Sequence, residues 1–108
     1  MSPESIDGAS YQLRTVDAGP TTHVILSGEI DLAAREALVD AINAALDHCS
    51  ELVFDLTEVT FLDSTGIGAM ARALQHEKTV VVRNPSSSVR RALEVSGIDL
   101  HIRVEPPA

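Results

Sequence analysis

Aromatic and basic side chains are both scarce in this 108-residue sequence. Tryptophan is absent and aromatic residues make up only 3% of the chain, so Leu, Ile, Val and Ala must fill most of the core. Eight Lys and Arg stand against 16 Asp and Glu, which gives a formal net charge of −8. This excess of acid argues against a nucleic-acid backbone or an anionic membrane surface as partner, and it favours a basic protein surface.

The sequence contains a single cysteine, Cys49, so no internal disulfide can form. His48 lies beside it, but one His and one Cys do not supply the four ligands of a zinc site. We therefore expect a thiol at a helix end, with no metal and no cofactor. No apolar run approaches the ~18 residues that span a bilayer, and the polar start lacks the basic region of a signal peptide. These absences predict a soluble, cytoplasmic protein.

Hydropathy follows the period of a strand in some segments and of a helix in others. Residues 1–9 are polar and predict a flexible lead-in to one domain at 10–105. The predicted strands are 11–16, 22–28, 51–56, 79–82 and 101–104, and the predicted helices are 31–48, 64–76 and 89–97. The order β-β-α-β-α-β-α-β predicts an α/β fold with helices packed on a mostly parallel central sheet of about five strands.

The segment "FLDSTGIGAM" (61–70) changes from strand to helix character in its middle. A helix start leaves about four amides unpaired and carries partial positive charge, so Asp63 and Ser64 are suited to cap it. Asp31 stands in the same way ahead of the first predicted helix. Gly66 and Gly68 would keep the first turn thin, so that the backbone of another molecule could approach. Packing alone does not obviously require two glycines there.

Two interpretations of this junction remain open. The simpler one is a capped helix at a tight turn between strand and helix. The other is a phosphoacceptor, because a phosphate on Ser64 would add about −1.5 to −2 charges at a helix start, which tolerates anions. Such a modification would leave the fold intact and make the surface around it repulsive to a partner.

Three motifs in order along the chain resemble the STAS-domain proteins of the bacterial anti-sigma factor antagonist family. They are "LSGEID" (26–31), "LVFDLTEVTFLDSTGIGAM" (52–70) and "VVVRNPSSSVRRALEVSGID" (80–99). The resemblance implies a STAS-like fold. It also implies that the serine after the aspartate, Ser64 here, is phosphorylated by an anti-sigma factor that is also a serine kinase.

The resemblance further implies a switch of partners. The unphosphorylated antagonist binds the anti-sigma factor and frees a sigma factor, and a serine phosphatase resets the phosphorylated form. Carried over to this sequence, the acidic residue that helps to bind the kinase is Asp31. The residues that flank the acceptor in the contact surface are Asp63, Thr65, Gly66 and Ile67, and Asn84 is placed at its rim. Thr65 could be a secondary acceptor.

The sequence departs from the family pattern in two places. The stretch "ALQHEKTVVV" (73–82) is several residues shorter than the family has there and lacks its glycine-rich turn. The chain also ends soon after the last predicted strand, where the family commonly adds a helix. An apolar strip left uncovered there could be covered by a second copy of the chain, in a homodimer, or by a partner.

Two other classes of function were weighed. Against an enzyme, "DSTGIG" is not the G-x-S-x-G pattern of a nucleophile, and Lys78 is far from any phosphate-binding glycine pattern. A serine nucleophile also needs a histidine beside it, but each histidine lies at a predicted strand or helix end; these are His23, His48, His76 and His101. The alternative that stays open is a STAS-type adaptor or ligand-sensing subunit of another regulatory or transport complex. An intact Asp63–Gly66 favours the phosphorylation switch.

Overall fold

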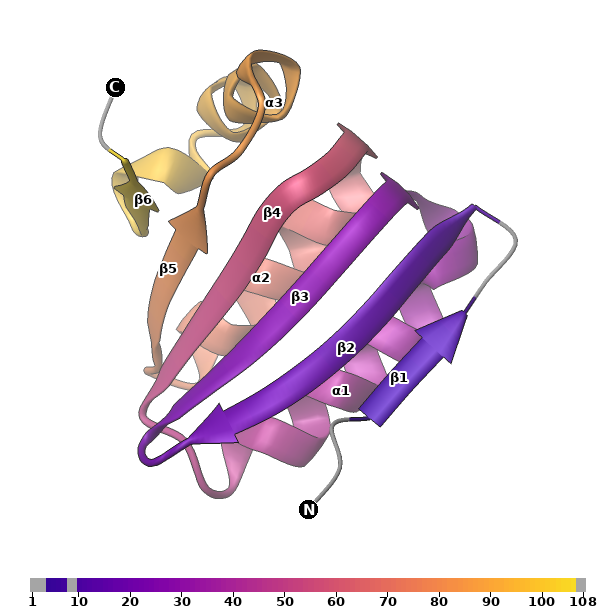
Figure 1. Cartoon of the computed structure of the whole chain (residues 1–108). Helices are drawn as coiled ribbons and strands as arrows, with labels where there is room; N and C mark the ends of the chain where they lie inside the picture. The colour runs from indigo at the N-terminus through magenta and orange to yellow at the C-terminus, as the bar shows by residue number, and fades with distance from the viewer. Residues whose placement is uncertain (1–3, 8–9, 107–108) are drawn as a thin grey trace.

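One sheet organises the computed structural model, which describes residues 4–7 and 10–106 (Figure 1). Its strands are β1 (Glu4–Asp7), β2 (Tyr11–Ala18), β3 (Thr21–Ile30), β4 (Glu51–Leu62), β5 (Thr79–Arg83) and β6 (Arg103–Glu105). They lie side by side in chain order. β1, β2 and β3 pair antiparallel, whereas β3, β4, β5 and β6 pair parallel. The predicted α/β architecture is confirmed, with β2 to β6 as its five strands.

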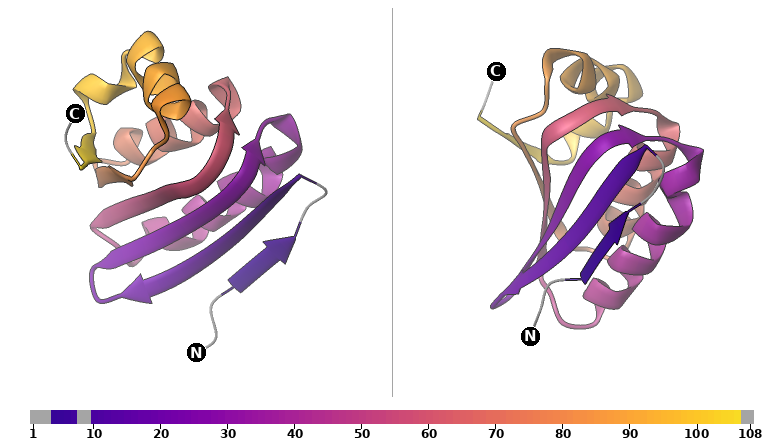
Figure 2. Two further views of the ribbon diagram at one scale, coloured as in Figure 1. Left: turned by 45° about the horizontal axis from the view of Figure 1, so that its top comes forward. Right: turned by 45° about the vertical axis from the view of Figure 1, so that its right-hand side comes forward.

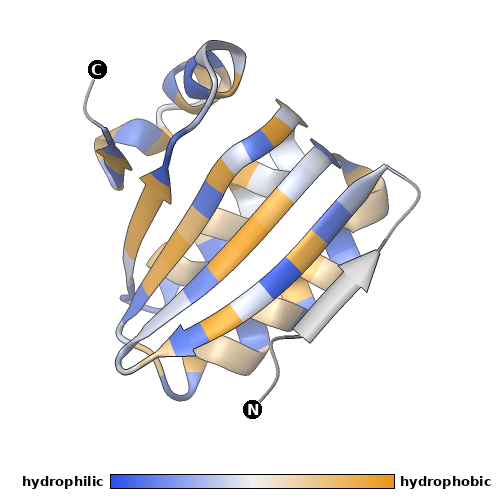
Figure 3. Cartoon of the chain, in the orientation of Figure 1, coloured by the Kyte–Doolittle hydropathy of each residue, from blue (hydrophilic) through white to orange (hydrophobic). Residues whose placement is uncertain are grey.

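Three α-helices pack against this sheet, two of them behind its central strands and the last one beside the end of β4 (Figure 2). They are α1 (Arg35–Leu46), α2 (Ser64–Gln75) and α3 (Ser87–Ser96), with short 3₁₀ helices η1 (Leu32–Ala34) and η2 (Ile98–Leu100). Their apolar faces and the strands share one buried core, which includes Phe54, Ile42, Met70 and Leu93. The hydropathy colours of Figure 3 show the apolar residues concentrated along the central strands. None of the helices in residues 4–7 and 10–106 is long and apolar enough to cross a membrane.

The structure differs from the flexible lead-in predicted over 1–9. Glu4–Asp7 forms β1, which pairs with Gln12–Thr15 of β2. The remainder of that segment, residues 1–3 and 8–9, lies outside the described residues. Without β1, one edge of β2 would present unpaired backbone groups, and pairing satisfies them whatever the polarity of the side chains. A hydropathy pattern does not report this backbone pairing.

Two strands are longer than their sequence patterns indicated. β3 was predicted to stop at Gly28. It continues instead to Ile30, with an irregularity in its register with β4. Gly28 has φ +82°, and a side chain there would overlap the carbonyl oxygen of Ser10. β4 likewise runs past its predicted end at residue 56 to Leu62, because the extended β3 continues to pair with it.

The shortened connection after α2 closes without glycine. The amide of Lys78 donates to the carbonyl of Ala73 at 3.2 Å, and the amide of Glu77 donates to that of Leu74 at 3.0 Å. This pattern normally places glycine at the residue with positive φ, but Glu77 occupies it with φ 61°. Gly97 holds the matching position after α3, at φ 81°, as predicted.

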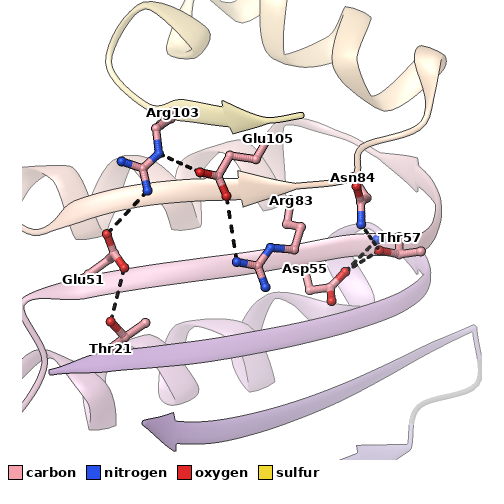
Figure 4. Close-up of polar contacts among 8 residues, drawn as sticks. All are labelled: Thr21, Glu51, Asp55, Thr57, Arg83, Asn84, Arg103 and Glu105. Carbon is pink, nitrogen blue, oxygen red and sulfur yellow. Dashed lines mark hydrogen bonds and ion pairs between the residues drawn. The ribbon is translucent and has the colours of Figure 1, made fainter. Parts of the chain in front are cut away.

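A network of charged side chains lies on the sheet face that the helices leave open (Figure 4). The ion pairs are Arg103–Glu105 at 3.0 Å, Arg83–Glu105 at 3.8 Å and Arg103–Glu51 at 4.0 Å. Val53 and Val81 are buried, but they do not belong to the core that lies between the sheet and the helices. Because long charged side chains can bury their stems against apolar groups, this network can shield both valines.

Candidate functional site

Two aspartates stand side by side where neighbouring parallel strands end. Ile30 of β3 pairs with Leu62 of β4, so the residues that follow, Asp31 and Asp63, occupy equivalent positions. The amide of Asp63 donates to the carbonyl of Ile30 at 3.3 Å. The carboxyl ends of parallel strands are where α/β sheets commonly bind their ligands. The strand-to-helix junction predicted within residues 61–70 therefore lies where α/β sheets commonly bind their ligands.

Each aspartate caps the helix start that follows it. Oδ1 of Asp31 accepts a hydrogen bond from the amide of Ala33 at 3.0 Å, ahead of η1. Oδ1 of Asp63 accepts one from the amide of Thr65 at 2.8 Å, ahead of α2. The caps predicted at Asp31 and Asp63 are confirmed, whereas Ser64, also predicted to cap, is the first residue of the helix, directly after the Asp63 carboxylate.

Ser64 is the first residue of α2, and its side chain is exposed. Within the described part of the chain its hydroxyl makes no hydrogen bond. The positive end of the twelve-residue helix lies beneath it, so an added anion would meet a favourable field. Thr65, beside it, is only partly exposed.

The two glycines of this turn have different surroundings. Gly66 is buried, and a Cβ there would overlap Cδ1 of Leu62 and lie 3.2 Å from Cγ2 of Ile30. Close packing of α2 on β3 and β4 requires this glycine, and its predicted place in a partner-contact surface stays a prediction. Gly68 is exposed, and a Cβ there would meet no atom within 4 Å.

Ser64 lies at an open groove between α1 and α2, which we call the α1–α2 groove. Its lining residues are Leu32, Arg35, Val39, Ser64, Thr65, Gly68, Ala69, Arg72 and Gln75. Arg35 and Arg72 were not predicted as site residues, because only the packing of α1 against α2 brings them together. Leu32 and Val39 did carry a signal, since both are apolar but lie off the stripe of apolar residues of the predicted helix 31–48, which includes Ala34, Leu38 and Ile42.

Of the six predicted contact residues, only Thr65 lines the α1–α2 groove, and Asp31, Asp63, Gly66, Ile67 and Asn84 do not. Ile67 lies on another side of α2, where it lines a second hollow with Ala71, Leu74 and Ile98. This second hollow is a partly apolar surface near the end of the chain. That a second copy of the chain covers this second hollow stays a prediction.

Asn84 lies directly after β5. Its side-chain Nδ2 donates to Oγ1 of Thr57 at 3.2 Å (Figure 4). β4 continues from Thr57 to Asp63, and six residues of extended chain span about 20 Å. The predicted rim position of Asn84 therefore stays a prediction, and it would require a contact surface that extends along β4.

Two large apolar side chains are exposed close to the paired aspartates in sequence. Leu32 follows Asp31 directly and is 73% exposed, and Phe61 precedes Asp63 by two residues and is 49% exposed. Exposed apolar groups beside charged ones are typical of protein interfaces. This environment suits contact with another protein.

Histidine and carboxylate groups are not arranged for catalysis at Ser64. The ion pair between His48 and Asp17, at 3.2 Å, lies where β2 and α1 end. A hydrogen bond from Thr22 and a second from His48 lower the pKa of the Asp17 carboxyl. His76 contacts the carbonyl of Arg72. Among residues 10–106, no histidine is hydrogen-bonded to Ser64, and no group of three metal-binding side chains was found.

Comparisons with known proteins identify the fold and the family. A family model described as "Mlab, STAS domain" matches residues 13–104. The chain is similar to an anti-sigma factor antagonist from Mycobacterium paratuberculosis, with 32% identity over 91% of this chain and 87% of that one and a TM-score of 0.74. It also resembles the anti-sigma factor antagonist SpoIIAA in its unphosphorylated form, with 23% identity over 88% and 87% of the two chains and a TM-score of 0.75. The Bacillus cell fate determinant SpoIIAA in the phosphorylated form gives 22% identity over 88% and 90%, with a TM-score of 0.67.

Proposed function

This protein belongs to the STAS-domain family, and we propose that it is an anti-sigma factor antagonist switched by phosphorylation of Ser64. The unphosphorylated form binds an anti-sigma factor that has serine kinase activity, and this binding frees a sigma factor. Phosphorylation by that kinase ends the binding, and a serine phosphatase restores it. The protein acts in the cytoplasm, without a cofactor and without catalysing a reaction itself.

The position of Ser64 carries this proposal. An exposed hydroxyl on the first residue of α2 is accessible to a kinase, and it stands above the positive end of the helix dipole. A phosphate there costs the fold little, because the helix start gains a few tenths to ~2 kcal/mol from a nearby anion. The added charge therefore acts mainly on whatever contacts this surface.

The surrounding carboxylates make the change in binding large. Asp31 and Asp63 already place negative charge beside Ser64, and a phosphate adds about −1.5 to −2 more. A partner fitted to the unmodified surface must then accommodate both the bulk and the charge of the phosphate. A loss of about a hundredfold in affinity corresponds to ~2.7 kcal/mol of differential binding.

The solved relatives support this reading. The Mycobacterium paratuberculosis protein, at 32% identity, is itself an anti-sigma factor antagonist. SpoIIAA has been solved in unphosphorylated and phosphorylated forms, so a protein of this fold accommodates the modification. We take residues 10–105 as the unit that carries the function, because the site and the helices around it lie inside that range.

Charge variants at position 64 test the proposal. Each kinase-type anti-sigma factor of the source organism is purified and titrated with the wild type and with the variants S64A and S64D. We expect one of these anti-sigma factors to bind the wild type and S64A tightly, and to bind S64D much more weakly. Ser87 offers a matched control, because it is the exposed first residue of α3 and S87D adds the same charge at another helix start. Tight binding of S64D would overturn the charge-operated release.

A second candidate function rests on the description of the matching family model, which names Mlab rather than an anti-sigma factor antagonist. On this alternative the chain is a STAS-type adaptor or ligand-sensing subunit of another regulatory or transport complex. Mass spectrometry of the protein from its native cells separates the two. Phosphate on Ser64 supports the switch, whereas an unmodified Ser64 in a stable complex with transport proteins supports the adaptor.

A further inference from the structure

The α1–α2 groove concentrates positive charge in a protein that has little of it. Only eight residues of the chain are Lys or Arg, and Arg35 and Arg72 both line this groove. No Asp or Glu lines it. Glu36 and Asp40, which follow in α1, line a neighbouring hollow with Arg35. The lining of the groove therefore carries two positive charges and no negative one, while Asp63 precedes Ser64 and the hollow with Glu36 and Asp40 shares Arg35 with the groove.

The charge of both arginines is available to a partner. Arg83 and Arg103 form ion pairs with glutamates, whereas neither Arg35 nor Arg72 pairs with any Asp or Glu among residues 10–106. Nε of Arg72 donates to Oδ1 of Asn43 at 2.7 Å, which positions this guanidinium between α1 and α2. A positioned guanidinium loses less side-chain entropy when it binds a carboxylate.

The groove also offers apolar contact. Leu32 and Val39 line it from the side of η1 and α1, and Leu32 is 73% exposed. Gly68 leaves open space on the side of α2, because no side chain projects there. A segment that fits this lining combines apolar side chains with carboxylates. Basic segments would be repelled by the two arginines.

We propose that the α1–α2 groove receives an acidic, partly apolar segment of the anti-sigma factor, with Arg35 and Arg72 binding its carboxylates. This inference rests on the proposed function and names the chemistry of the partner surface. It also gives the phosphate a specific target. Ser64 lines the same groove, so its phosphate competes for the arginines and repels the carboxylates of the segment.

Charge reversal in the groove tests this proposal. Each purified kinase-type anti-sigma factor of the source organism is titrated without nucleotide against the full-length wild type, R35E and R72E. We expect each reversal to lower the affinity at least tenfold. The lysine variants R35K and R72K keep the charge and should stay within about threefold of the wild type. Arg91, an exposed residue of α3 that lines neither hollow of α2, supplies the control R91E.

Thermal unfolding of every variant separates lost binding from lost folding. R72E removes the contact with Asn43, so R35E, which breaks no hydrogen bond among residues 10–106, is the decisive variant if R72E unfolds. Wild-type affinity in R35E, or tighter binding, would overturn the inference and leave the proposed function standing. An effect seen only when ATP is present would also overturn it, because the arginines would then meet nucleotide phosphates. If no anti-sigma factor binds the wild type, the proposed function itself fails and the inference fails with it.

Discussion

Asp31 and Asp63 occupy equivalent positions on neighbouring parallel strands, and each caps the helix start that follows it. The strand pairing holds their backbones together, and the capping hydrogen bonds fix their side chains. Ser64 follows directly after the second cap, so the same contacts determine where its hydroxyl lies. Two ordinary helix caps thus build the edge of the candidate binding surface.

Replacing either aspartate by alanine should lower the free energy of unfolding by about 1 kcal/mol, because a cap is lost. Asparagine also caps helices, so D31N and D63N should keep most of the stability. Denaturant unfolding measures these differences. If Asp31 also binds the anti-sigma factor through its charge, D31N should fold like the wild type but bind more weakly. Wild-type binding by D31N would restrict Asp31 to its capping role.

The glycines of α2 should respond to alanine in opposite directions. G66A introduces a Cβ against Leu62 in a buried position, and overpacking of this kind costs typically 1–3 kcal/mol. G68A places its Cβ in open space on an exposed helix position and should gain up to ~1 kcal/mol. Thermal unfolding of the two variants compares them directly. Equal stabilities would contradict the packing described for Gly66.

Replacing Glu77 by glycine should stabilise the folded protein. Its φ of 61° costs an ordinary residue roughly 1–2 kcal/mol, while glycine adopts it freely but gains entropy in the unfolded chain. E77G should therefore raise the free energy of unfolding by about 0.5–1 kcal/mol. E77A is the matched control, because it removes the same charge and keeps the strained backbone. A gain in E77A as large as in E77G would assign the effect to charge.

Local signals in the sequence predicted much of the candidate site. Asp63 before an apolar helical period predicted both the cap and a helix start at Ser64, because capping involves residues only two or three apart. Gly97 likewise predicted the end of α3. The succession of strands and helices along the chain, from β2 to β6, followed from the alternation of their hydropathy patterns, whereas the order of the strands in the sheet was not predicted.

The remaining features depend on contacts between distant segments. Arg35 and Arg72 meet only because α1 packs against α2, and no spacing in the sequence reports that contact. Asn84 was placed at the rim only by the family resemblance, and no local pattern reports that β4 continues well beyond the end of β5. The requirement for Gly66 arises from Leu62 and Ile30 beneath it, which only the folded structure brings together.

The most direct test of the account measures folding and binding on one phosphorylated sample. Protein carrying phosphoserine at position 64 is compared with the wild type in thermal unfolding and in titration against the anti-sigma factor that binds it. The same change at the first residue of α3, phosphoserine at position 87, serves as control. We predict an unfolding temperature close to that of the wild type and an affinity about a hundredfold lower, ~2.7 kcal/mol, for position 64 alone. Unchanged affinity, or a phosphoprotein that unfolds, would contradict the claim that the start of α2 accepts the phosphate while the partner rejects it.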